Sequence, residues 1–145
     1  MKKYIHYGHT SFDKEKFLPI KNRDFFVKPI GGLWASNVRA KFGWKDWCEA
    51  EHFRDCKKEN SFTFVLSKDA KVLEINSVQQ LTYLPKVKDQ IGLVTWTVLD
   101  FELLSTMYDA IELNISKDYD LYWKLYGWDC DCILIMNPEI VQVLL

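Results

Sequence analysis

A continuous apolar run near the C-terminal end constrains the fold of this chain more than any other feature. The segment CILIMN, residues 132–137, carries no charged side chain and is followed at once by Pro138. A short run that is apolar at every position, and not only at alternate ones, is typical of a strand covered on both faces. The next segment, PEIVQVLL at 138–145, is predicted to form an edge strand or a hairpin partner. We therefore expect residues 132–137 to form a central strand of a sheet.

Further strands are predicted where β-forming residues alternate or cluster between turn signals. These segments are residues 2–8, 33–36, 61–67, 71–76 and 108–115, and the turn KDA at 68–70 predicts that 61–67 and 71–76 form a hairpin. Helices are predicted at 45–55, 77–84, 100–107 and 118–126, and a loop or one short helical turn at 10–22. No repeat or interdomain linker interrupts the chain. The sum is a single α+β domain over residues 1–145, with a mostly antiparallel sheet and short peripheral helices.

Composition limits the classes of partner that this chain is expected to have. It has 145 residues, enough for one hydrophobic core, and 48% of them are hydrophobic, which excludes a disordered chain. Nineteen basic residues against twenty acidic ones leave a formal net charge of −1. This balance gives no electrostatic reason to expect nucleic acid or an anionic membrane as the partner. No apolar run is long enough to span a bilayer, so no membrane partner is expected.

The N-terminal segment and the cysteines indicate a cytoplasmic protein. The segment MKKYIHYGHTSF starts basic but never reaches the apolar region of a secretory signal. Cysteines 48, 56, 130 and 132 could form two disulfides. In a chain with a full core and no signal, however, they are expected to be reduced.

The tripeptide His6-Tyr7-Gly8 ends the first predicted strand. A glycine there lets a ligand approach the backbone, whose N–H and C=O can act as a paired donor and acceptor for a flat amide. The imidazole beside it could bond a ribose hydroxyl. The alternative is a strand end with a partly buried histidine and no ligand.

The stretch GGLWAS, residues 31–36, combines a bare backbone with a large ring and a hydroxyl. Gly31 and Gly32 allow positive φ and the close approach of another chain segment or of a ligand. Trp34 offers a stacking surface, and Ser36 points to the same side of the strand. Together they suit a nucleotide-like ligand. A β-bulge beside a core tryptophan would give the same residues.

Acidic residues supply the candidates for chemistry. Glu112 lies in an apolar strand, where a carboxylate is costly to bury without a partner, so it lies either at the surface or in a cleft. Asp129 and Asp131, in GWDCDC, are the second acidic candidates. No metal site is expected, because the cysteines do not match zinc-ligand spacing and the three histidines are scattered. The sequence has no phosphate-binding loop, no dinucleotide glycine motif and no serine nucleophile elbow.

The order of these segments resembles the ADP-ribosyltransferase superfamily, the fold of diphtheria toxin and the poly(ADP-ribose) polymerases. The matching segments, in order, are HYG, GGLWAS, WKDWCEAEHF, FTFVLSKDAKVLEIN, YDAIELN and CILIMNPEIV, which together cover most of the chain. The resemblance implies a split sheet and NAD as a substrate. It also implies that the first strand binds NAD through His6, with Tyr7 and Gly8 beside it. The second strand would pack the nicotinamide pocket through Gly32, Leu33, Trp34, Ala35 and Ser36.

The catalytic acid that the resemblance implies has two candidates. In the family a glutamate on a later strand bonds the nicotinamide-ribose hydroxyl and stabilises the cationic transition state. Glu112 in AIELN resembles that position, whereas an alignment of DCILIMNPEIV with another family strand gives the role to Asp131 or its neighbour. His6 completes the catalytic set. Ala110 departs from the double-acid motif of arginine-specific members, and the paired aromatic residues of the family are not clear here.

The resemblance implies an NAD-dependent mono-ADP-ribosyltransferase that modifies a macromolecular acceptor, expected to be a protein. The compact size suits a bacterial or phage effector. A binding module on the same fold, which engages NAD, ADP-ribose or a protein without turnover, is the alternative. A protein-interaction domain that uses its tryptophans as anchors is a third hypothesis. The position of Glu112 relative to His6 discriminates among them.

Overall fold

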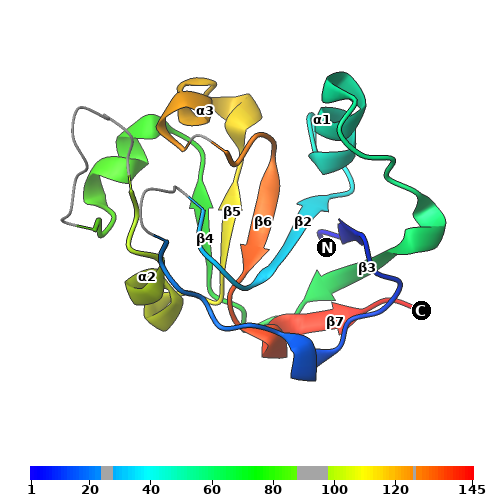
Figure 1. Ribbon diagram of the computed structural model, residues 1–145. Coiled ribbons are helices and arrows are strands. Elements are labelled where there is room, and N and C mark those ends of the chain that lie inside the picture. The colour runs from blue at the N-terminus through cyan, green and yellow to red at the C-terminus, as the bar shows by residue number, and fades with distance from the viewer. Residues whose placement is uncertain (24–27, 88–97, 126) are drawn as a thin grey trace.

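The computed structural model describes residues 1–23, 28–87, 98–125 and 127–145, which form an open sheet with short helices around it (Figure 1). The strands lie in the order β4-β5-β6-β2-β1-β3-β7. Their bounds are β1 Tyr4–Tyr7, β2 Leu33–Asn37, β3 Ser61–Leu66, β4 Val72–Ile75, β5 Ala110–Leu113, β6 Cys132–Ile135 and β7 Val141–Val143. Every neighbouring pair is antiparallel except β4 and β5, which are parallel. The predicted α+β class and mostly antiparallel sheet are confirmed.

The apolar run at 132–137 forms the buried strand that the sequence predicts. Strand β6 lies between β5 and β2, and all four of its residues are buried. Ile133 and Ile135 point into one hydrophobic cluster, whereas Cys132 and Leu134 point into the other. Because both faces are covered, an alternating polar residue would have no place in this strand. The following strand β7 lies at the edge of the sheet, as predicted.

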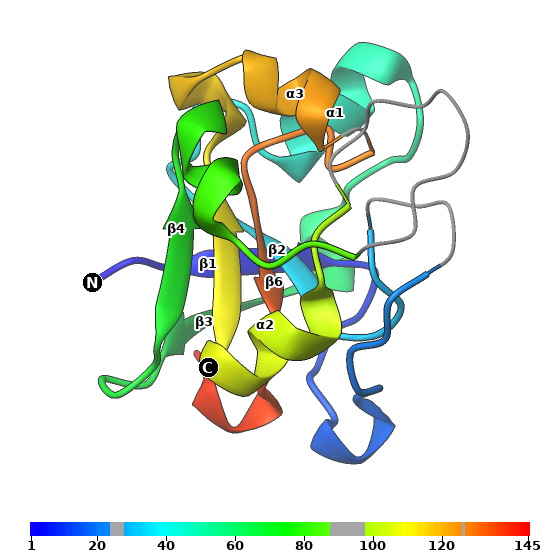
Figure 2. The same cartoon turned by 90° about the vertical axis from the view of Figure 1, so that its left-hand side faces the viewer.

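The sheet consists of two parts that meet at a short pairing between β1 and β2. This pairing includes only Tyr4 with Asn37 and Ile5 with Ser36. Beyond it, β1 continues beside β3 and β2 continues beside β6. Figure 2 shows β1 and β3 running across the direction of β4, β5 and β6. The two parts therefore diverge after Ile5, next to His6 and Trp34.

The helices are short and lie around the sheet. They are α1 Trp44–Glu51, α2 Phe101–Met107 and α3 Asp120–Lys124, with the 3₁₀ turns η1 Lys14–Lys16, η2 Lys58–Asn60, η3 Val78–Tyr83, η4 Ile115–Lys117 and η5 Pro138–Ile140. Helix α1 ends before the predicted residue 55, because His52 takes a left-handed φ of 52° and Phe53 N–H closes on Cys48 O. Within the described residues, no helix is long and apolar enough to cross a membrane.

The predicted hairpin of residues 61–67 and 71–76 is wrong. Strand β3 pairs with β1 and β7, whereas β4 pairs in parallel with β5 at the opposite end of the sheet. Two hydrogen bonds direct β4 to this place: Lys71 N–H donates to Asp109 Oδ2 at 2.8 Å, and Asp109 N–H donates to Lys71 O at 2.8 Å. The local turn at 67–70 is present, since Ala70 N–H bonds Ser67 O. Long-range pairing, however, decides which strands become neighbours.

Candidate functional site

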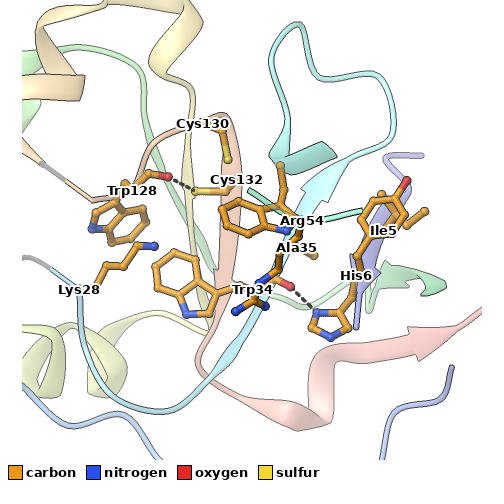
Figure 3. Close-up of a pocket in the computed structure, with 11 residues that line it drawn as sticks. Ile5, His6, Lys28, Trp34, Ala35, Arg54, Trp128, Cys130 and Cys132 are labelled. Carbon is orange, nitrogen blue, oxygen red and sulfur yellow. Dashed lines mark hydrogen bonds between the residues drawn. The ribbon is translucent and has the colours of Figure 1, made fainter. Parts of the chain in front are cut away.

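A cavity of about 230 Å³ lies where β1 and β2 diverge. Its apolar wall and its polar rim come from segments far apart in the sequence (Figure 3). The wall consists of Ile5, Trp34, Ala35, Trp44, Trp128, Cys130 and Cys132, and the rim of His6, Tyr7, Lys28 and Arg54. The indoles of Trp34 and Trp128 meet edge to face, with ring centroids 4.8 Å apart. An apolar cavity with a few polar groups is the usual form of a small-molecule site.

Two cationic side chains, Lys28 and Arg54, line this cavity. Among the described residues, no carboxylate lines it. Lys28 Nζ lies over the Trp34 ring, 5.2 Å from its centroid. The Arg54 guanidinium lies over Phe53, 5.0 Å from that centroid. Figure 3 shows Lys28 close to the Trp34 and Trp128 rings. The charge of the lining therefore favours an anionic ligand with an aromatic part.

The imidazole of His6 is held by two hydrogen bonds. Its Nδ1 lies 2.7 Å from Trp34 O, and its Nε2 lies 2.9 Å from His9 Nδ1. A carbonyl only accepts, so Nδ1 carries the proton and donates it to Trp34. Neutral His6 then accepts at Nε2 from His9. Both ring nitrogens are therefore engaged within the chain, and these bonds fix the His6 ring at the end of β1.

The backbone N–H and C=O of Tyr7 are open toward β2. Gly8 N–H donates to Asn60 O at 2.9 Å, so the alternation of the ladder directs the backbone N–H and C=O of Gly8 and His6 toward β3. Those of Tyr7 then point toward β2, where the register leads to Trp34. Trp34 O instead accepts from His6 Nδ1. Among the described residues, no backbone pairing reaches the Tyr7 N–H and C=O. They form the donor and acceptor that the sequence suggested for Gly8.

A second cavity, of about 650 Å³, adjoins the first. His6 and Trp34 line both cavities. The second is further lined by Gly8, Gly32 and Leu33 and by rings that include His9, Phe12 and Phe62. Seven of the eight residues predicted to bind NAD thus line one cavity or the other. The exception is Ser36, whose buried Oγ donates to Asp131 O at 2.8 Å and accepts from Trp44 N–H at 2.9 Å.

Glu112 does not line either cavity. Its neighbours Ile111 and Leu113 point into the cluster that contains Cys132, so Glu112 points to the other face of the sheet. There its Oε1 accepts from Lys2 Nζ at 2.7 Å, and Lys2 also bonds Glu74. An enzyme was expected to have Glu112 facing the His6 cleft, but Glu112 instead contacts Lys2 and Tyr4 and lines neither cavity that His6 lines.

Glu112 also contacts the buried Tyr4. Burial raises the pKa of the Tyr4 phenol well above its usual value, and a hydrogen bond to Glu112 raises it further. The buried carboxylate is therefore satisfied by an ammonium and a phenol, as a buried charge must be. Its surroundings give it a structural role between β1 and β5.

Asp131 is buried, and both of its carboxylate oxygens accept hydrogen bonds from other segments of the chain. Its Oδ1 accepts from Ser116 N–H at 2.8 Å, and its Oδ2 accepts from Ser116 Oγ at 2.7 Å and from Phe42 N–H at 3.3 Å. Neighbouring Asp129 differs, because it is half-buried and has a left-handed φ of 65°. Burial raises the pKa of Asp129, while the charge of Lys28 lowers it. Asp129 is thus an acid electrostatically coupled to a cation that lines the first cavity.

Several lining residues could not be recognised in the sequence. Lys28 and Arg54 carry no motif, and Trp128, Cys130 and Cys132 come from a segment whose acids, cysteines and apolar strand gave no indication of a cavity. The abundance of tryptophan was the only signal, and it was equally consistent with a core.

Comparison with protein-family models, with curated proteins and with solved structures gave no match to this chain. Among the described residues, no three histidine, cysteine or acidic side chains are grouped to hold a metal ion.

Acid is expected to destabilise the fold through His6. Burial lowers the pKa of His6, and the charge of His9 lowers it further, while the bond to Trp34 opposes them. A histidine in the unfolded chain has a pKa of about 6.5. Below that pH the unfolded chain therefore binds a proton at His6 that the folded protein does not yet bind. Stability should therefore fall as pH drops from about 6.5 through the lower folded pKa. Urea unfolding at a series of pH values measures this loss, which His6→Gln should reduce; an equal loss in both proteins would exclude His6 as its source.

Proposed function

We propose that this protein binds NAD, or another dinucleotide that contains ADP-ribose, in the two adjoining cavities where β1 and β2 diverge. The observation that carries the proposal is the pair of open backbone groups of Tyr7, its N–H and its C=O, beside the His6 ring. A carboxamide such as that of nicotinamide needs one donor and one acceptor side by side, and the N–H and C=O of one residue in a strand, which point to the same side, supply both. This arrangement supports the implied NAD site with the contact moved from Gly8 to Tyr7.

The shape and charge of the cavities suit the rest of such a ligand. A dinucleotide has two ring systems joined by a diphosphate. The indoles of Trp34 and Trp128 offer an apolar surface in the first cavity, and His9, Phe12 and Phe62 offer rings in the second. Lys28 and Arg54 are the cations available to the phosphates. Because His6 and Trp34 belong to both cavities, one ligand can contact both.

Binding without turnover is better supported than transfer. Cleavage of the nicotinamide–ribose bond leaves positive charge on the sugar, and a fixed carboxylate beside it would stabilise that charge. Glu112 bonds Lys2 and lines neither cavity, and Asp131 is engaged by Ser116 and Phe42. The binding module on an ADP-ribosyltransferase-like fold, in the cytoplasm, is therefore the function that we propose.

A second candidate is NAD-dependent mono-ADP-ribosyl transfer to a macromolecular acceptor with Asp129 as the acid. The position of Asp129 favours it, since this carboxyl adjoins Trp128 in the chain and interacts electrostatically with Lys28. A left-handed φ at a residue other than glycine is costly and is often found at functional sites. Release of nicotinamide that is lost in Asp129→Asn would support this candidate over binding alone.

Substitution of Tyr7 by proline tests the proposed contact. Proline removes the N–H that faces the cleft, and it breaks no bond to β3 because Tyr7 and Ser61 form a non-bonded pair of that ladder. We expect NAD to bind at least about tenfold more weakly to Tyr7→Pro than to Tyr7→Ala, since one hydrogen bond in a sheltered site is worth about that factor. Titration calorimetry with NAD, ADP-ribose and nicotinamide measures it.

One further variant completes this experiment. Glu112→Gln should bind NAD as the wild type does, whereas a large loss in this variant would return Glu112 to the site. Circular dichroism of each variant verifies the fold. Absence of any heat or thermal shift with NAD or ADP-ribose in the wild type would overturn the proposed function and favour a protein-interaction domain.

A further inference from the structure

Two imidazoles, those of His6 and His9, face each other in the second cavity. The Nε2 atom of His6 lies 2.9 Å from Nδ1 of His9, and both side chains line the cavity. The ring planes are nearly parallel, at 16°, with centroids 5.2 Å apart, so the two nitrogens meet at the edges of the rings. Imidazole is the commonest metal ligand among the side chains, and two of its nitrogens directed at one place are the beginning of a metal site.

The backbone at Gly8 brings the two side chains together. Residues three apart on a straight strand point to opposite faces, so His6 and His9 could not meet if β1 simply continued. The strand ends at Tyr7, and Gly8 turns the chain with a φ of +117°. The bond from Gly8 N–H to Asn60 O, at 2.9 Å, holds this turn beside the start of β3. Histidines that are scattered in the sequence are therefore in part brought together by the fold.

His6 is already oriented as a metal ligand. Its Nδ1 donates to Trp34 O at 2.7 Å, which leaves the lone pair of Nε2 directed at His9. Histidines that bind metals almost always donate their other ring N–H to a carbonyl, a carboxylate or water, and this bond fixes the ring and its tautomer. His9 is exposed, so its ring is free to turn. Two nitrogens bound to one tetrahedral Zn²⁺ at about 2.0–2.1 Å lie about 3.3 Å apart, so His9 needs to move by less than about 1 Å.

We propose that His6 and His9 bind a late first-row divalent metal ion such as Zn²⁺, through Nε2 of His6 and Nδ1 of His9. The metal takes the place of the hydrogen between the two rings, and the proton of His9 moves to its Nε2, so that both rings stay neutral. Among the described residues, no third histidine, cysteine or acidic side chain joins this pair. Two positions of a tetrahedral ion therefore stay open to water or to a ligand, as in metal sites that bind substrates.

The donors and the charge of the cavity select the class of metal. Imidazole nitrogens favour Zn²⁺, Ni²⁺ and Cu²⁺, whereas Mg²⁺ and Ca²⁺ need oxygen ligands. Besides the histidines, the titratable side chains that line this cavity are Asp13 and Lys16. Their charges balance, so no excess of positive charge opposes a cation. The inference does not depend on NAD binding, because the two imidazoles supply both protein ligands.

Nitrogen NMR spectra of the histidine rings test this site in the full-length protein. The third histidine of the chain, His52, is an internal reference, because it is exposed and lines a different hollow, near the end of α1. Zn²⁺ is added to the reduced protein without any nucleotide. We expect the signals of His6 Nε2 and His9 Nδ1 to shift together and to saturate at one Zn²⁺ per chain, while His52 stays in place. A chelator should reverse the shifts, and Mg²⁺ should produce none.

Matched variants give the size of the effect. His9→Gln should raise the Zn²⁺ concentration at the midpoint of the His6 shift at least about tenfold, since loss of a ligand costs no less than loss of its supporting bond. His52→Gln should leave that midpoint unchanged. The inference is overturned if Zn²⁺ leaves His6 and His9 unshifted, even where it binds elsewhere in the chain, or if His9→Gln binds it as the wild type does.

The wild-type spectra alone identify the ligands, so no outcome depends on whether a variant folds. Because no nucleotide is present, a failure to bind Zn²⁺ would leave the proposed NAD binding untouched.

Discussion

Replacing Asp131 by alanine is expected to lower the free energy of unfolding by about 4 kcal/mol. The carboxylate is buried and accepts three hydrogen bonds, two from Ser116 and one from the Phe42 peptide. Alanine would leave the peptide N–H groups of Ser116 and Phe42 in a partly buried place without an acceptor. Each such group costs about 1–3 kcal/mol, and hydrogen bonds to a charged group are stronger than neutral ones. The variant would also loosen the start of β6.

Urea unfolding measures this loss, and two variants serve as controls. Asp131→Asn keeps one acceptor oxygen and should lose about half as much stability. Asp69→Ala removes an exposed carboxylate of the turn before β4 and should change stability by less than about 0.5 kcal/mol. If Asp131→Ala stays as stable as the wild type but loses NAD binding or turnover, the role of Asp131 belongs to the site and not to the fold.

Replacing Gly32 by alanine is expected to cost about 4 kcal/mol of stability. Gly32 has a φ of +76°, which strains any residue with a side chain. A Cβ there would lie 2.6 Å from Leu134 Cδ1 and 2.8 Å from Ile135 O, and the latter is backbone of the central strand that cannot move aside. The bare backbone at Gly32 is thus required by close packing of the chain against β6. The sequence left two explanations for the glycines at 31 and 32, the close approach of another chain segment or of a ligand. At Gly32 the neighbour is another chain segment.

Gly8 supplies the matched control for this prediction. Gly8 also has a positive φ, of +117°, but a Cβ there would meet only His6 Nε2, at 3.8 Å. Gly8→Ala should therefore show strain without overlap and cost about 1–2 kcal/mol. Thermal unfolding of both variants gives the comparison. Equal losses in the two variants would mean that backbone strain alone accounts for the effect and that packing against β6 does not contribute.

The site could be predicted from the sequence only where its residues are neighbours in the chain. His6-Tyr7-Gly8 and the stretch from Gly32 to Ala35 were recognised because each carries its own local signal, and they do line the two cavities. The open N–H and C=O were assigned to Gly8, because the sequence does not show toward which neighbouring strand a residue directs these groups. Only the pairing of Gly8 with Asn60 shows that Tyr7 is the open position.

The roles of the acidic residues could likewise be predicted only in part, because their partners are distant in the sequence. The sequence showed that Glu112 needs a partner if it is buried, but not that Lys2, far away in the chain, would be that partner. It allowed a catalytic Asp131, and the tertiary structure surrounds this side chain with donors from Ser116 and Phe42. Alternation along a strand gives the face of each residue. What lies on that face depends on segments that only folding brings together.

The sequence by itself determined the class of the fold, the buried central strand at 132–135, the short helices and their approximate places. These features depend on local patterns of apolar residues, caps and turns, which act over a few residues. The tertiary structure alone decided that β3 and β4 lie at different ends of the sheet and that β1 and β2 diverge after Ile5. The physical reason is that strand pairing and side-chain contact are chosen by the burial of surfaces distant in sequence, and these surfaces meet only in the folded chain.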